Sequence, residues 1–105
     1  MAKKQGYLIH IPADPDLPLR KEPFKGKEPK YEDLSKAVGG FIERVQLLYN
    51  GKSHNAFANE EGLLKGLPYN ARATAMYADH WKKKHIPVDA HIVGDVVMIY
   101  WEKTV

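Results

Sequence analysis

The sequence contains no cysteine and no long apolar run, and these two absences exclude several classes of protein. With 0 cysteines, the chain has no thiolate nucleophile, no disulfide framework and no cysteine-based metal site. No apolar run approaches the roughly 20 residues that cross a bilayer. The apolar stretch Tyr7–Ile11 is also too short for the core of a signal peptide. We therefore expect a cytoplasmic protein that makes no contact with a membrane.

A strong excess of one charge is also absent. Sixteen basic residues stand against 13 acidic ones, which gives a net charge of +3. The basic residues gather in Lys3–Lys4, Arg20–Lys30 and Lys82–Lys84, whereas a dedicated nucleic-acid binder usually concentrates them on one face. A lysine run at a helix end more often complements the helix dipole than contacts DNA. Nucleic acid is therefore not the partner that we expect.

The stretch Val38–Asn70 carries the clearest structural signals. Phe41–Tyr49 alternates with a period of two, which predicts a half-buried strand. Asn50-Gly51 is a strong hairpin signal because both residues tolerate a positive φ. His54–Glu60 then reads as the returning strand. A turn follows, and it contains a short apolar patch formed by Leu63, Leu64 and Leu67.

The remaining elements flank this stretch. We predict strands at Gly6–Pro12 and Ile92–Trp101, the second at the centre of the sheet because both of its faces are apolar. We predict helices at Tyr31–Val38 and Asn70–Lys84, and a polar tail from Glu102. The fold class is therefore α+β: a mainly antiparallel sheet of about four to five strands, with one main helix packed on a face and a short second helix. Residues 1–105 form a single domain.

The segment 12–30 interrupts these elements with five prolines, at positions 12, 15, 18, 23 and 29. Proline disfavours helix in the residue before it, so we predict a long loop or arm. Loops of this length in a small domain tend to be functional or mobile. Two interpretations stay open. The segment is either a loosely ordered connector or an arm that reaches a second subunit or covers a pocket.

Four short motifs occur in a fixed order along the chain. They are Val-Gly-Gly-aromatic-Ile-Glu at 38–43, Asn-Glu-Glu-Gly at 59–62, Gly-Leu-Pro-x-Asn at 66–70 and Gly-Asp at 94–95. In this combination the sequence resembles a family of small phage- and plasmid-borne domains of unknown function. The resemblance implies a compact α+β domain from a virus or mobile element, located in the cytoplasm of the host cell. It implies no established activity.

The sequence offers little for catalysis. No Ser-His-Asp or Cys-His order has supporting context, and no glycine-rich loop ends in Gly-Lys-Ser/Thr. The five histidines lack the spacing of metal ligands. We therefore expect a protein that is not an enzyme and that binds neither a metal nor a cofactor.

The strongest candidate site is a polar cluster around the start of the main helix. Its members are Asn59, Glu61, Tyr69, Asn70 and Arg72. A helix N-terminus offers free N–H groups that suit a phosphate, and Arg72 could add a bidentate contact. The alternative is structural, because asparagines also satisfy N–H groups in turns and helix caps. If Asn70 is only a cap, Asn70→Asp should be nearly neutral in stability.

These observations leave three functional hypotheses. The first is a non-enzymatic binding protein of a phage or mobile element that sequesters a small phosphate-bearing, nucleotide-like ligand of host defence. The second is a protein–protein interaction domain that inhibits a host protein or forms a homodimer through an exposed edge strand. The third is weak nucleic-acid binding through Lys82–Lys84, Arg72 and Lys65, with Tyr69 available to stack.

Overall fold

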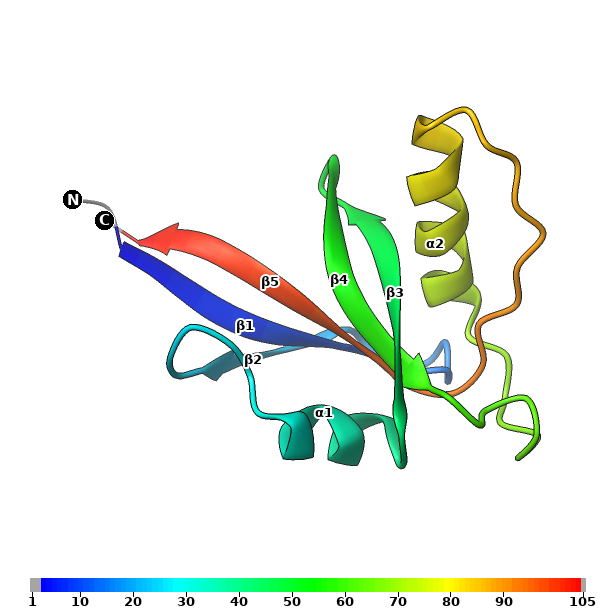
Figure 1. Cartoon of the computed structure of the whole chain (residues 1–105), viewed down its shortest axis with the longest axis horizontal. Helices are drawn as coiled ribbons and strands as arrows, with labels where there is room; N and C mark the ends of the chain where they lie inside the picture. Colours follow the sequence, from blue (N-terminus) through cyan, green and yellow to red (C-terminus); the bar gives the residue numbers. More distant parts are fainter. Residues whose placement is uncertain (1–2, 105) are drawn as a thin grey trace.

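The fold is a five-stranded antiparallel sheet with one helix packed on each face, and the computed structural model describes residues 3–104 of it (Figure 1). The elements in chain order are β1 (Lys3–Ile11), β2 (Arg20–Phe24), α1 (Tyr31–Val38), β3 (Ile42–Tyr49), β4 (Lys52–Asn59), α2 (Ala71–Lys83) and β5 (Val96–Thr104). The predicted α+β class, with one main helix and one short helix, is confirmed. Within the described residues, no helix is long and apolar enough to cross a membrane.

The strand order in the sheet is β2-β1-β5-β4-β3, which puts β5 at the centre as predicted. β1 and β5 pair along their whole length, from Lys3 opposite Thr104 to Ile11 opposite Val96. β4 meets β5 only where Ala56 lies opposite Met98 and Phe57 lies opposite Val97. The sheet therefore splays into two arms, the β1–β5 arm and the β3–β4 hairpin, which diverge clearly in Figure 1.

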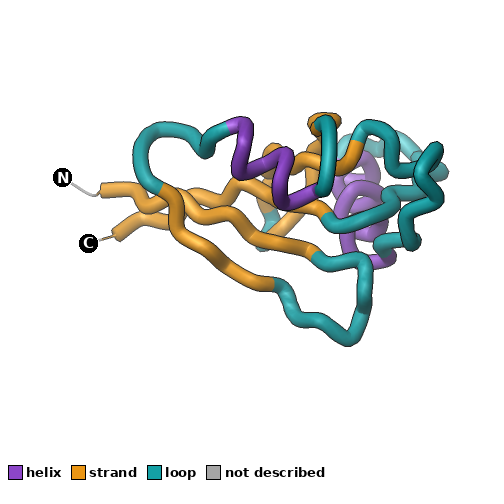
Figure 2. The backbone as a smooth tube through the Cα atoms, turned by 90° about the horizontal axis from the view of Figure 1, so that it is seen from below, coloured by secondary structure: helices purple, strands orange, loops and turns teal. Residues whose placement is uncertain are grey.

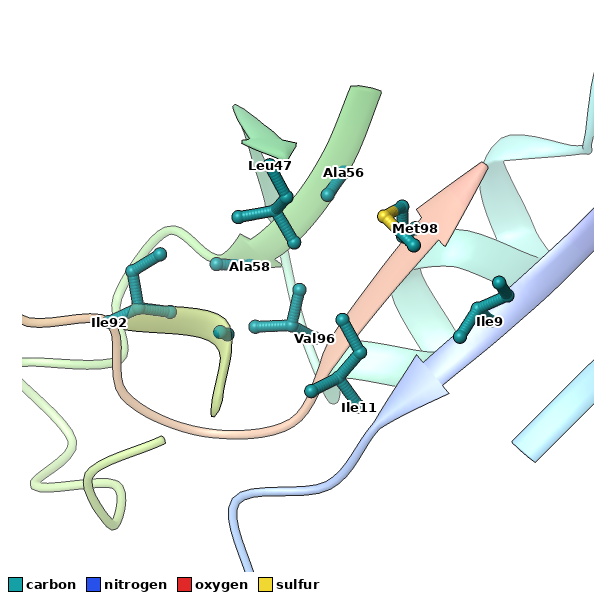
Figure 3. Packing of buried hydrophobic residues seen from close by; sticks show 9 residues of the cluster. Ile9, Ile11, Leu47, Ala56, Ala58, Ile92, Val96 and Met98 are labelled. Atoms are coloured by element: carbon teal, nitrogen blue, oxygen red, sulfur yellow. The ribbon is translucent and has the colours of Figure 1, made fainter. Parts of the chain in front are cut away.

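Two apolar clusters hold the helices to opposite faces of the sheet. α2 packs through Ala73, Met76 and Tyr77 on the larger cluster, whose buried members are shown in Figure 3. α1 packs through Leu34 and Val38 on the other face. Figure 2 shows α1 along one side of the strands and α2 at the far end of the sheet. The alternation of side chains along the strands therefore supplies both clusters.

Two turns form where the sequence predicts them. Gly39 ends α1 in the left-handed region at φ 79°, and its N–H donates to the carbonyl of Ser35. Asn50 and Gly51 join β3 to β4 with φ values of 50° and 78°. Two successive positive φ values match the hairpin turn that follows the right-handed twist of paired strands.

Two predicted boundaries are wrong near the chain ends. β1 begins at Lys3 and not at Gly6, and β5 covers Val96–Thr104 and not Ile92–Trp101. The predicted polar tail is therefore mostly strand, while its last residue, Val105, lies outside the described residues. The reason is mutual pairing: each strand satisfies the backbone groups of the other, so both continue through polar residues.

The prediction of a loop over the whole of segment 12–30 is also wrong, because Arg20–Phe24 forms β2 and pairs with β1. Pro23 lies within this strand and has no N–H to donate to a partner strand. β2 lies at the edge of the sheet, where a residue without an N–H is tolerated because one side of the strand needs no donor. Phe24 fixes this edge: it lies over Gly6 and packs edge-on against Trp101, with ring centroids 5.2 Å apart.

Candidate functional site

The four sequence motifs meet at one end of the sheet. The N–H of Gly94 donates to the carbonyl of Pro68 at 2.7 Å, and the N–H of Glu60 donates to the carbonyl of Phe41 at 2.8 Å. These bonds tie the Gly-Asp motif to the Gly-Leu-Pro motif, and the Asn-Glu-Glu-Gly turn to the start of β3. Residues far apart in sequence are thus fastened together where β4 ends and α2 begins (Figure 1).

Two glycines of these motifs are required by packing. A Cβ on Gly94 would lie 2.8 Å from Leu67 Cδ1, and the φ of Gly94 is +79°. A Cβ on Gly62 would lie 2.8 Å from Val93 Cγ2. Such distances are shorter than van der Waals contact, so a side chain at either position would force its neighbour to move. The glycines of the motifs therefore serve close packing.

Asn70 is fully buried and uses both ends of its amide. Its Oδ1 accepts the N–H of Ala73 at 3.0 Å, which confirms the predicted cap of α2. Its Nδ2 donates to the carbonyl of Ile11 at 2.8 Å and to the carbonyl of Gly94 at 2.9 Å. An amide nitrogen carries two hydrogens, so Asn70 keeps no donor for a ligand.

Asn59 and Arg72 are also engaged within the chain. Asn59 Oδ1 accepts the N–H of Glu61 at 2.8 Å, while its Nδ2 donates to the carbonyl of Val38 at 3.1 Å. Arg72 Nη2 donates to two carbonyls of the segment after β1, those of Pro12 at 2.8 Å and Asp14 at 3.0 Å. Arg72 therefore fastens this segment to α2.

Tyr69 and Glu61, the remaining members of the predicted site, lie nearer the surface. Tyr69 is 50% exposed, and its ring packs against the ring of His91 at 5.6 Å. The N–H groups of Ala73 and Thr74 at the helix start are already bonded to Asn70. The structure thus brings the five predicted residues to one end of the sheet, but three of them, Asn59, Asn70 and Arg72, already hydrogen bond to other parts of the chain. This arrangement does not favour an anion at the start of α2.

A different feature of the same segment faces outward. Leu63 and Leu64 are 74% and 88% exposed, on a turn that is internally hydrogen bonded. The N–H of Lys65 donates to the carbonyl of Glu61 at 2.9 Å, and that of Leu67 donates to the carbonyl of Gly62 at 3.0 Å. The turn therefore presents its two leucines to solvent from a fixed backbone. Leu67, the third member of the predicted apolar patch, is half-buried against Gly94.

Other exposed apolar residues lie around these leucines. Phe41 is 62% exposed beside the turn, and Leu63 shares a small cavity of about 80 Å³ with Glu43 and His91. We call this surface the apolar end; its members are Phe41, Leu63, Leu64, Tyr69 and His91. The sequence did not reveal the role of Phe41, because strand alternation assigned it to the half-buried face. It precedes β3 and is left uncovered.

The polar residues around the apolar end are mainly acidic. Glu43 and Glu60 line the small cavity and Glu61 follows on the turn, while the cations nearest to them in sequence are Arg44 on β3 and Lys65 on the turn. None of these side chains forms an ion pair with another part of the described chain. The rim therefore carries an excess of negative charge towards solvent.

The histidines of the β3–β4 hairpin and α2 have structural surroundings. His80 is 2% exposed, and its Nδ1 lies 2.6 Å from Ser53 Oγ. Burial lowers the pKa of His80, and nearby Lys84 and Lys83 lower it further. Burial also lowers the pKa of His54. Among residues 3–104, no three His, Cys, Asp or Glu side chains come together as a group that could hold a metal ion.

Comparison with known proteins gives one match. A family model described as a domain of unknown function (DUF3846) matches residues 9–104, a span that includes all four motifs and the whole proline-rich segment 12–30. The search of curated proteins and the search of solved structures gave no match. The match agrees with the resemblance to a family of unknown function. The phage or plasmid origin of the family stays a prediction.

Proposed function

We propose that this chain, which belongs to the DUF3846 family of domains of unknown function, is a non-enzymatic protein–protein interaction domain that binds its partner through the apolar end. The observation that carries this proposal is the pair Leu63 and Leu64, held outward at 74% and 88% exposure on a hydrogen-bonded turn. Clustered apolar residues rimmed by polar ones are typical of interaction sites.

Energetics favour such a role for the turn. Burying a leucine side chain stabilises a complex by about 1.5–3 kcal/mol. Because the backbone of the turn is already fixed by the N–H groups of Lys65 and Leu67, binding requires little further ordering of the chain. Phe41 and Tyr69 add aromatic area beside the leucines. Aromatic residues are enriched among those that dominate binding energy.

The acidic rim indicates the chemistry of the partner. Glu43, Glu60 and Glu61 would be matched by a surface whose apolar centre is bordered by lysines or arginines. A twofold homodimer through this surface would bring the glutamates of both copies together, which is unfavourable. The proposal is therefore a different protein with a basic rim. Inhibition of a host protein, phage or plasmid origin and action in the host cytoplasm are parts of this proposal.

The test is capture of a partner by the tagged chain and by two charged variants. Leu64→Glu introduces a charge into the apolar end, while Tyr31→Glu introduces the same charge at a 54% exposed residue of α1. We expect a host protein that is captured by the wild type and by Tyr31→Glu but not by Leu64→Glu. Its capture should weaken as salt rises.

Two results would contradict the proposal. Equal capture of the same protein by Leu64→Glu would show that the apolar end is not its binding surface. Light scattering that detects a wild-type dimer, with Leu64→Glu monomeric, would assign the surface to self-association instead.

The other two hypotheses have less support. A phosphate at the helix start would find the amide of Asn70 already bonded to Ile11 and Gly94. In the lysine run, Lys83 Nζ donates to the carbonyl of Gly51 and Lys84 Nζ lies 5.6 Å from the ring of Trp81. Both lysines therefore have contacts inside the chain.

A further inference from the structure

We infer that a second site, separate from the apolar end, binds a small zwitterion in the cleft between α1 and the β1–β2 pair. The cleft has a volume of about 570 Å³. Its lining residues come from the end of β1, the segment after β1, β2, α1 and the entry of β5.

The cleft exists because α1 covers only part of its face of the sheet. α1 packs on Leu8 and Val97, and the ends of β1 and β2 on the same face stay uncovered. His10 lies opposite Arg20 in the pairing of these strands, so their side chains emerge together. Leu17 and Ala37 add apolar side chains to the lining, whereas the side chains of Ile11 and Val96 pack in the cluster on the opposite, α2 face of the sheet. The site therefore combines polar and apolar side chains beside α1.

The segment after β1 is held in place beside the cleft. The N–H of Ala13 donates to Asp95 Oδ1 at 2.9 Å, and Arg72 binds the carbonyls of Pro12 and Asp14. These bonds join the segment to the entry of β5 and to α2. Leu17, which follows on this segment, lines the cleft. Segment 12–19 thus forms a wall of a pocket. This agrees with the interpretation of the segment as an arm that covers a pocket, and not as a loosely ordered connector.

The charges on the two walls differ in whether they are already paired. On the strand wall, Glu22 lies 3.2 Å from His10 and 3.6 Å from Arg20. On the helix wall, Asp33 and Lys36 lie three residues apart and so point to the same side of α1. Neither takes part in an ion pair with another described residue. Asp33 and Lys36 are therefore the charges that remain for a ligand.

The charged side chains that line the cleft indicate the class of ligand. Three carboxylates (Glu22, Asp33 and Asp95) face two permanent cations (Arg20 and Lys36), so with neutral His10 the lining carries a net charge of −1. Such a lining repels a phosphate dianion. The two unpaired charges, Asp33 and Lys36, match a molecule with one ammonium and one carboxylate group: the ammonium faces Asp33, and the carboxylate faces Lys36. A free amino acid with an apolar side chain would also contact Leu17 and Ala37.

The experiment compares L-leucine with two derivatives that each lack one charge. N-acetyl-L-leucine has no ammonium group and L-leucine methyl ester has no carboxylate; inorganic phosphate is the fourth probe. Binding is followed by amide chemical shifts in two-dimensional NMR. We expect leucine to shift amides of α1 and β2 and to bind about 10-fold more tightly than either derivative, since each lost ion pair is worth about 1.4 kcal/mol. Equal or tighter binding of phosphate or of either derivative, or no shift with any probe, overturns the inference.

Variants on one helix provide the matched control. Lys36→Gln should weaken leucine binding to the level of the methyl ester, and Asp33→Asn should weaken it to the level of the N-acetyl derivative. Glu32→Gln removes a charge from the neighbouring position of α1, outside the cleft, and should change nothing. Leu64→Glu should also bind leucine normally. Unchanged affinity in both Lys36→Gln and Asp33→Asn would overturn the assignment, whatever happens to partner capture.

Discussion

The segment from Asn59 to Arg72 contains two kinds of residue that behave in opposite ways. Its polar residues Asn59 and Asn70 are 6% and 0% exposed, whereas its leucines Leu63 and Leu64 are 74% and 88% exposed. Soluble domains usually distribute these types the other way. The comparison separates two roles: the buried amides hold the fold, and the exposed leucines are available to a partner.

This reversed distribution, with amides buried and leucines exposed, follows from the backbone of the turn. A turn between a strand and a helix has no neighbouring strand to satisfy its N–H and carbonyl groups, and buried ones must find a partner. Side-chain amides supply both a donor and an acceptor, so Asn59 and Asn70 are drawn inward. The inner space beside them is then occupied, in part by Leu67 against Gly94. Leu63 and Leu64 lie on the outer side of the turn, 74% and 88% exposed.

The largest expected effect comes from Asn70→Asp, which keeps the cap but removes both donors. Its carboxylate would face the carbonyl oxygens of Ile11 and Gly94, where Asn70 donates two hydrogen bonds. Burying this charge without a donor should destabilise the domain by about 3 kcal/mol or more. Urea unfolding measures the change, with Asn55→Asp on the exposed part of β4 as the control. A loss of unfolding free energy below about 1 kcal/mol would mean that Asn70 acts only as a helix cap.

Gly94→Ala is expected to have the second largest effect. The new Cβ combines an unfavourable φ of +79° with a 2.8 Å approach to Leu67 Cδ1, and together these should cost about 2 kcal/mol. Gly26 has a similar φ of +88° but nothing within 4 Å of its Cβ position. Gly26→Ala therefore isolates the backbone contribution. Equal losses of melting temperature in the two variants would mean that Leu67 moves aside freely.

Arg72→Met should have a smaller effect on stability and a local effect on the segment after β1. It removes the two hydrogen bonds to Pro12 and Asp14, worth about 1–2 kcal/mol together for a charged donor at a partly exposed site. Limited proteolysis should then cut within 12–19 faster than in the wild type. An unchanged cleavage rate would mean that the bond from Ala13 to Asp95 holds the segment alone.

The sequence predicted most elements because their patterns are local. Period-two alternation located β3, Asn50-Gly51 located the hairpin, and Tyr31–Val38 was predicted with its observed boundaries. β2 was missed because its stability comes from pairing with β1, and local composition cannot report such pairing. Three residues of the predicted polar cluster, Asn59, Asn70 and Arg72, hydrogen bond within the chain. Their partners were not predictable, because Ile11 and Val38 are 59 and 21 residues away from the amides that they bind.

Acid should act on neither half of the comparison but on two histidines outside it, buried His80 and half-buried His54. The amides of Asn59 and Asn70 do not ionise, whereas burial lowers the pKa of His54 and His80 in the folded state. The unfolded chain therefore binds protons more readily than the folded one. Stability should be complete above the ordinary histidine pKa of about 6.5 and fall as the pH drops through the lowered values. Urea midpoints between pH 7.5 and 5 measure this, and His80→Gln should reduce the slope.

The smallest expected effect on stability is that of Leu64→Glu. Leu64 is 88% exposed, so its replacement removes almost no buried apolar area, and surface changes of this kind stay within about 0.5 kcal/mol. The added carboxylate lies near Glu60 and Glu61 in sequence, which slightly opposes the substitution. The turn itself should persist, because the N–H of Lys65 and the carbonyl of Glu61 hold it without any contribution from the leucine side chain. A melting temperature equal to that of the wild type, together with loss of the partner, would separate binding from folding at this residue. A large loss of stability would instead mean that Leu64 packs on the domain in solution, and the contrast between the inward amides and the outward leucines would be lost.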